Sequence, residues 1–135
     1  MLVARAVYLA FALSALTILA VAANLTPSAS GLGTHTQLGL PACGFLSRTG
    51  WPCPSCGLTT SFALAARGRF GDAAFVQPFG FCLFVALAAA AAFFLYRAIR
   101  PIELSAVFDP DRTLSICKSA FGLYLGVWML QLWRY

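Results

Sequence analysis

Three long stretches of the chain carry no charged residue and consist almost entirely of apolar side chains: residues 6–23, 73–96 and 119–133. A helix needs about 20 apolar residues to cross the hydrocarbon layer of a membrane. The third stretch reaches this length if it begins near Leu114 and Lys118 extends its amine to the interface. The pattern therefore predicts an all-α integral membrane protein with three transmembrane helices, near residues 6–23, 75–96 and 114–133.

The segment between the first two spans has a different character. Residues 24–50 are rich in Gly, Pro, Ser and Thr, which favours an irregular loop, and we take residues 24–57 as a cysteine-containing loop outside the membrane. Residues 57–66 follow with Leu58 and Phe62 at helical spacing. This short helix cannot span a bilayer, so we expect it to be interfacial or re-entrant, within a single membrane domain of residues 1–135.

The first apolar stretch has an alternative interpretation as a cleaved signal peptide. Arg5 precedes it, and Ala20-Val21-Ala22 resembles a cleavage site. The uncharged run is longer than the usual apolar region of a signal peptide, which has about 7 to 15 residues. We therefore expect the first helix to be retained, with cleavage of residues 1–22 as the alternative.

Composition and charge point to a membrane rather than to a soluble partner. The chain of 135 residues is 61% hydrophobic and 10% charged, against about 25% charged residues in soluble domains. Its net charge of +5 comes from basic residues scattered beside the apolar stretches, without the clustered stripe that a nucleic-acid backbone requires. We expect a lipid bilayer, in a bacterial cell (inner) membrane, as the partner of this chain, and no nucleic acid.

The basic residues also bear on orientation. A cytoplasmic N-terminus puts five of them inside, namely Arg5, Arg97, Arg100, Arg112 and Lys118, and four outside, namely Arg48, Arg67, Arg69 and Arg134. This agrees with the excess of Lys and Arg on cytoplasmic loops. The cysteine loop is then extracytoplasmic and meets an oxidising compartment.

Chemistry is concentrated at three cysteines. Two residues separate Cys53 from Cys56, and Cys43 lies ten residues before Cys53. Together with His35, the only histidine, they form a candidate tetrahedral zinc site. A disulfide among the three cysteines is the equal alternative, and thiol–disulfide exchange is a third. Cys53 and Cys56 precede the short helix, whose dipole is expected to lower their pKa values.

The residues around these cysteines resemble a known family. The segment Thr49-Gly50-Trp51-Pro52-Cys53-Pro54-Ser55-Cys56-Gly57-Leu58-Thr59, with Cys43 before it and Gln77-Pro78 after it, is similar to the small prokaryotic membrane proteins grouped as domain of unknown function 2752. The resemblance implies that Cys43, Cys53, Cys56, Gly57 and Thr59 are the marked positions, and it implies no reaction. Thr60 replaces an arginine of the family pattern, and Gln77 replaces an asparagine, so a role that requires that arginine is not expected.

These observations favour an accessory or assembly component of a membrane complex, with a structural three-cysteine site and no assigned catalytic residue. The alternative is a membrane thiol–disulfide oxidoreductase that uses Cys53 and Cys56. Gly122 and Gly126 in the third span form a small-xxx-small pair, which allows close helix packing. Their partner is the second span of the same chain, another copy of the chain, or another membrane subunit.

Overall fold

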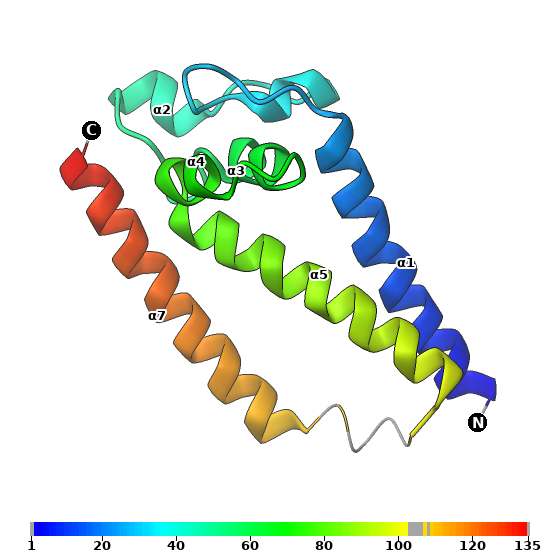
Figure 1. Ribbon diagram of the computed structural model, residues 1–135. Helices are drawn as coiled ribbons and strands as arrows, with labels where there is room; N and C mark the ends of the chain where they lie inside the picture. The colour runs from blue at the N-terminus through cyan, green and yellow to red at the C-terminus, as the bar shows by residue number, and fades with distance from the viewer. Residues whose placement is uncertain (1, 103–106, 108, 135) are drawn as a thin grey trace.

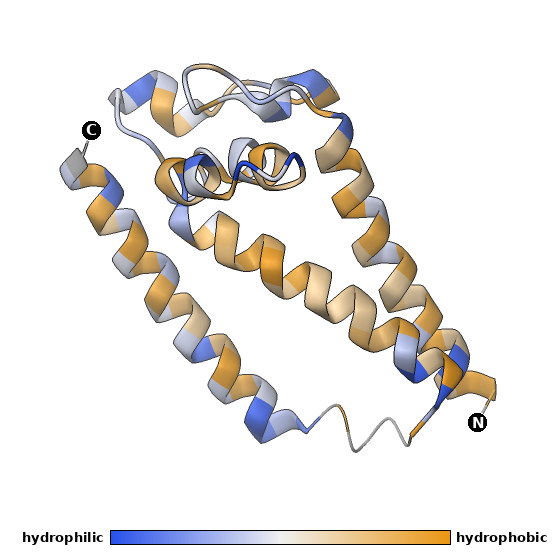
Figure 2. Cartoon of the chain, in the orientation of Figure 1, coloured by the Kyte–Doolittle hydropathy of each residue, from blue (hydrophilic) through white to orange (hydrophobic). Residues whose placement is uncertain are grey.

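The chain is described by a computed structural model that covers residues 2–102, 107 and 109–134. Every regular element in these residues is a helix, which confirms the all-α prediction. Three helices are long: α1 (Leu2–Asn24), α5 (Pro78–Ile99) and α7 (Pro110–Arg134). Each is long and apolar enough to cross a membrane, and Figure 2 shows apolar residues along most of their length. The chain thus has the build of a multi-pass membrane protein.

Short helices gather at one end of the long ones (Figure 1). They are the 3₁₀ helix η1 (Thr34–Leu38) and the α-helices α2 (Gly44–Thr49), α3 (Leu58–Ala65) and α4 (Phe70–Val76). We call residues 25–77, which contain them, the cap. The sequence analysis expected a largely irregular loop and one short helix here. Two additional short helices form here, and each ends at a glycine with a left-handed backbone. Helix η1 ends at Gly39 and α2 ends at Gly50, with φ of 75° and 74°.

Helix α3 lies at the centre of the cap and is buried on nearly all sides. Residues 60–65 are all buried. Leu64 and Ala65 pack with Ala73 of α4 into a core cluster that Phe84 of α5 also contacts. Other parts of the chain therefore cover α3, which is the condition under which a short helix is tolerated beside the hydrocarbon layer.

The uncharged run of residues 73–96 is divided between two helices. Gln77 has an extended backbone, with φ of −153° and ψ of 95°, and Pro78 is the first residue of α5. A proline cannot donate the backbone hydrogen bond that would continue α4, and it disfavours helical geometry in the residue before it. The chain turns at this point, so α4 belongs to the cap, and α5 begins as a separate helix long and apolar enough to cross a membrane.

Helices α1 and α5 make the most extensive helix–helix contact among the described residues. Alanines are prominent on the buried stripe of α1, which includes Ala12 and Ala15 as well as Tyr8, and small side chains let membrane helices approach closely. The Tyr8 hydroxyl donates to the carbonyl oxygen of Ile102 at 3.0 Å. Phe94 of α5 stacks on Phe11, with ring centroids 5.2 Å apart. The two helices are therefore joined near the N-terminus of the chain and diverge toward the cap (Figure 1).

Helix α7 stands apart from this pair. Most of its side chains are exposed, although Val127 is buried, and its contact with α5 is much smaller than that between α1 and α5. Tyr124 reaches Phe79 at the start of α5, with ring centroids 5.0 Å apart. Helix α7 is thus attached to the rest of the chain near the cap.

Candidate thiol site

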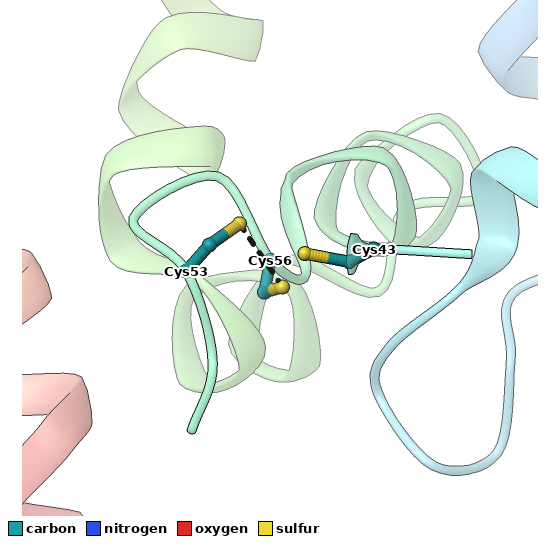
Figure 3. A group of neighbouring side chains, drawn as sticks. All are labelled: Cys43, Cys53 and Cys56. Carbon is teal, nitrogen blue, oxygen red and sulfur yellow. Dashed lines mark hydrogen bonds between the residues drawn. The ribbon is translucent and has the colours of Figure 1, made fainter. Parts of the chain in front are cut away.

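The fold brings together the three cysteines that the sequence singled out. Cys43 caps the N-terminus of α2, and Cys53 and Cys56 lie in the turn before α3. The three Sγ atoms all lie within 4.8 Å of one another, and those of Cys53 and Cys56 are 3.1 Å apart. Figure 3 shows the three sulfurs facing a common point. Two segments of the cap therefore converge on one cluster of thiols.

The turn that carries Cys53 and Cys56 is fixed by its own backbone. The Cys56 N–H donates to the carbonyl oxygen of Cys53 at 3.0 Å, and the Leu58 N–H donates to that of Ser55 at 3.1 Å. Gly57 ends the turn with φ of 88° and caps α3. A Cβ atom there would lie 3.2 Å from a methyl group of Val76, so both conformation and space require glycine.

A buried amide holds this turn from the other side, and the sequence analysis did not identify it as part of the site. Gln77 is fully buried, and its Nε2 donates to the carbonyl oxygen of Pro54 at 3.2 Å. Its Oε1 accepts from the Gly80 N–H at the start of α5. The buried Ser61 hydroxyl contacts the Gln77 carbonyl oxygen at 3.2 Å. The signal available in the sequence was a polar residue directly before a proline that opens a helix.

Three side chains on one face of α7 contact the cysteine turn and the end of α4. The Tyr124 hydroxyl bonds that of Ser55 at 2.8 Å, and the Trp128 Nε1 donates to the carbonyl oxygen of Pro52 at 3.1 Å. Gln131 donates to the carbonyl oxygen of Val76 at 3.2 Å. The spacing of four and then three residues puts all three on one side of the helix. We call Tyr124, Trp128 and Gln131 the clamp of α7. None of the three was identified from the sequence as part of the site.

The three thiols differ in acidity. The backbone amide of Leu46, in the first turn of α2, lowers the pKa of Cys43 to about 7, because an N–H donor stabilises the thiolate. Burial raises the pKa of Cys56 to about 12, and the neighbouring Cys53 adds to the shift. The expected lowering is therefore wrong for Cys56, since desolvation outweighs the helix N-terminus. Among Cys43 and Cys56, negative charge first develops on Cys43.

The other residues named from the sequence lie around the cluster without joining it. His35 is on η1, and its Nε2 lies 3.2 Å from the carbonyl oxygen of Pro41. The group of neighbouring sulfurs includes Cys43, Cys53 and Cys56 but not His35. Thr59 is half-buried in the first turn of α3. Thr60, which stands at the family's arginine position, is buried and bonds the hydroxyl of Thr34 at 2.8 Å.

The two remaining cysteines are separate from this site. Cys82 is exposed on α5 and Cys117 is exposed on α7. Neither belongs to the sulfur cluster, so both serve as internal controls for thiol chemistry.

A cavity adjoins the cluster on the side of α7. Its volume is about 220 Å³, and Cys56, Pro52, Val76 and Gln131 are among its lining residues. The Gln131 Oε1 is buried and has no hydrogen-bond partner. Cys56 is only 6% exposed and lies against this cavity.

Comparison with known proteins finds one family. Residues 43–91 match the family described as "Protein of unknown function (DUF2752)". The matching segment contains the three clustered cysteines, the short helices α2 to α4 and the first part of α5. No curated protein and no solved structure matches the chain.

Proposed function

We propose that this chain, whose residues 43–91 match the family described as "Protein of unknown function (DUF2752)", is an accessory or assembly component of a membrane complex, built around a structural three-cysteine site. The observation that carries the proposal is the convergence of three sulfurs within 4.8 Å of one another. The site ties α2 to the turn before α3, and the clamp ties that turn to α7. Its role is to hold the cap and α7 in one arrangement.

The chemistry of the donor set fits a soft metal ion, and zinc is the proposed ligand. Thiolates bind zinc at about 2.3 Å, so sulfurs at the corners of a tetrahedron lie about 3.8 Å apart. The Cys53 and Cys56 sulfurs are 3.1 Å apart and no pair of the three is more than 4.8 Å apart, so small side-chain shifts suffice to reach this value. A fourth ligand completes the tetrahedron, and His35 of η1, the chain's only histidine, is the proposed candidate. A structural disulfide remains the alternative use of the same thiols.

The assembly role is supported by the two faces of α7. The clamp faces the cysteine turn. At 100° per residue, Gly122 and Gly126 lie on the opposite side of the helix, and nothing lies within 4 Å of where their Cβ atoms would be. This open space favours a helix from another subunit or a second copy over packing against α5. We propose that the partner is a membrane helix seated on this glycine face.

The proposed setting is a bacterial inner membrane, with the N-terminus in the cytoplasm and the cap outside it. The support comes from the distribution of basic residues, of which five lie on the proposed cytoplasmic side and four on the other. In this orientation the three thiols face an oxidising compartment, where bound metal or a disulfide protects them from further oxidation.

The first experiment counts thiols and zinc in the native membrane. Maleimide labelling is measured before and after reductant, and before and after a zinc chelator, and zinc is measured per chain in the purified protein. We expect one zinc per chain and labelling of the cluster only after chelation. Cys53→Ser should lose the zinc, whereas Cys82→Ser on α5 should keep it. Labelling only after reductant would identify a disulfide instead.

A second experiment tests the assembly role separately. Gly126→Leu fills the open face of α7 without touching the clamp, and it should abolish association with the partner helix, measured by cross-linking in the membrane. Ile116→Ala, at an exposed site on α7 about 100° around the helix from the glycine pair, is the control and should leave association unchanged. If Gly126→Leu associates as the wild type does, the proposed interface is wrong.

The alternative function is a membrane thiol–disulfide oxidoreductase, favoured by the 3.1 Å separation of the Cys53 and Cys56 sulfurs. In this reaction the two thiols reduce a disulfide of a substrate protein. They give up two electrons and two protons, and a Cys53–Cys56 disulfide forms. This function requires mixed disulfides with other proteins to accumulate in Cys56→Ser, and their absence would remove it.

A further inference from the structure

A second cavity lies away from the thiols, inside the part of the chain that crosses the membrane. Its volume is about 480 Å³, and most of its lining comes from α1, α3 and α5, with Leu38 of η1 and Leu25 added at the cap. Helix α1 contributes Ile18 and Val21, α3 contributes Leu58 and Phe62, and α5 contributes Leu83 and Leu87. The cavity is larger than the one beside Cys56 and falls in the size range of ligand sites, about 300 to 1,000 Å³.

The arrangement of the helices explains why the space exists. Near the N-terminus of the chain, α1 and α5 are held together by Tyr8, Phe11 and Phe94. Toward the cap the two helices diverge, and α3 lies across the wide end (Figure 1). The cavity therefore occupies a wedge with two transmembrane helices as walls and a buried helix as its roof.

The lining offers few hydrogen-bonding groups to a water molecule. Two hydroxyls belong to it, those of Thr17 and Thr59. The Thr17 hydroxyl already donates to the carbonyl oxygen of Leu13 at 2.8 Å. A buried water needs two to four polar partners, and apolar cavities of only about 150 Å³ stay dry and bind hydrocarbons such as benzene. A space three times that size with apolar walls is thus suited to an apolar occupant.

The position of the walls identifies the occupant. Ile18, Val21 and Leu83 are 49%, 40% and 39% exposed, and they belong to helices that are long and apolar enough to span the hydrocarbon layer. The medium beside such helices consists of acyl chains. We propose that this wedge is a binding site for the hydrocarbon chain of a membrane phospholipid, which enters sideways between α1 and α5 and ends beneath α3.

Bound lipid would stabilise the junction of α1, α3 and α5. The upper half of α1 and the first turns of α5 meet α3 around the wedge, and a chain that fills it supplies contacts that an empty space lacks. The proposal does not depend on the thiol site, because no cysteine lines this cavity.

The test is photolabelling of the full chain in vesicles. The probe is a phosphatidylglycerol that carries a diazirine in the middle of one acyl chain, diluted into phosphatidylethanolamine, and labelled peptides are mapped by mass spectrometry. We expect labelling of residues 17–25 and 58–62 to exceed that of Met129 and Leu130, which are 69% and 62% exposed on α7. Labelling that follows exposure alone, with α7 labelled most, would overturn the proposal.

A pair of variants on α5 sharpens the test. Leu87→Trp places a large side chain in the wedge and should reduce labelling of residues 17–25 about tenfold, since overfilling a cavity opposes its occupant. Leu95→Trp, on the same helix but outside the cavity, should leave that labelling unchanged. An equal loss in both variants, or in neither, would contradict the proposal. The wild-type labelling pattern decides the question alone if Leu87→Trp fails to accumulate.

Discussion

Replacing Gln77 with leucine tests whether the buried amide holds the cysteine turn. The change keeps a similar volume but removes both polar atoms. The Pro54 carbonyl oxygen then loses its donor, and the Gly80 N–H loses its acceptor at the start of α5. Ser61 keeps its contacts with the backbone, because it bonds carbonyl oxygens and not the amide.

The expected cost follows from these two losses. Removal of a helix N-cap costs about 1 kcal/mol, and a carbonyl left without a partner in a partly buried position costs about 1 to 2 kcal/mol. We therefore expect Gln77→Leu to lower the free energy of unfolding by about 2 to 3 kcal/mol. The turn before α3 should open more often as a result, and Cys56 should become easier to label.

The control is Gln37→Leu. Gln37 also makes two hydrogen bonds to backbone, at 2.6 Å and 3.0 Å to Thr26, but it is exposed. Water replaces these bonds, so we expect a change within about 0.5 kcal/mol. The two variants thus differ in burial and not in the number of hydrogen bonds.

Unfolding is followed in mixed micelles, by tryptophan fluorescence as the fraction of denaturing detergent rises. The rate of maleimide labelling of Cys56 in reduced protein gives a second, local measure. The reasoning is refuted if Gln77→Leu is no less stable than Gln37→Leu, or if it is less stable while Cys56 remains as protected as in the wild type.

Two further predictions concern the same site. In reduced, metal-free protein, alkylation of Cys43 should fall as the pH drops through about 7, its lowered pKa, because the thiolate is the nucleophile. Cys56, with its pKa raised to about 12, should stay unreactive up to pH 9, and peptide mass spectrometry after iodoacetamide treatment measures both. Equal reactivity of the two at pH 8 would contradict the assignment of charge to Cys43. Gly57→Ala should destabilise the protein by about 1 to 3 kcal/mol more than Gly68→Ala. Both glycines have positive φ, but only at Gly57 does the added Cβ crowd Val76. Detergent unfolding compares them, and equal losses would show that crowding contributes nothing.

The local parts of the site were predictable from the sequence. Cys53 and Cys56 are separated by two residues, and Gly57 supplies the positive φ that starts α3, so neighbouring residues alone bring these two sulfurs together. The same holds for the break at Gln77, where Pro78 enforces a new helix. The conformation of a turn or of a helix start depends on adjacent residues, so the sequence predicts these local features specifically.

Other features depend on residues that are distant in the sequence. Tyr124 and Trp128 of the clamp reach the cysteine turn across 69 and 76 residues, and Gln131 reaches Val76 across 55. In the sequence, Tyr124, Trp128 and Gln131 resemble ordinary residues of an apolar helix. The burial of Gln77 likewise depends on α3 and α5 packing around it, and no pattern near Gln77 encodes that packing.

The sequence by itself determined the class of protein and the place of its chemistry. Runs of about 20 apolar residues are compatible with a bilayer only as helices, since every backbone polar group must be satisfied internally. Because three of the cysteines lie in one loop, that loop is the expected place of any thiol or metal chemistry. Only the tertiary structure decided how the thiols differ, because the acidity of Cys43 and Cys56 depends on a neighbouring amide and on burial. It also decided which face of α7 is open and where the wedge lies, because burial is set by the segments that meet in space.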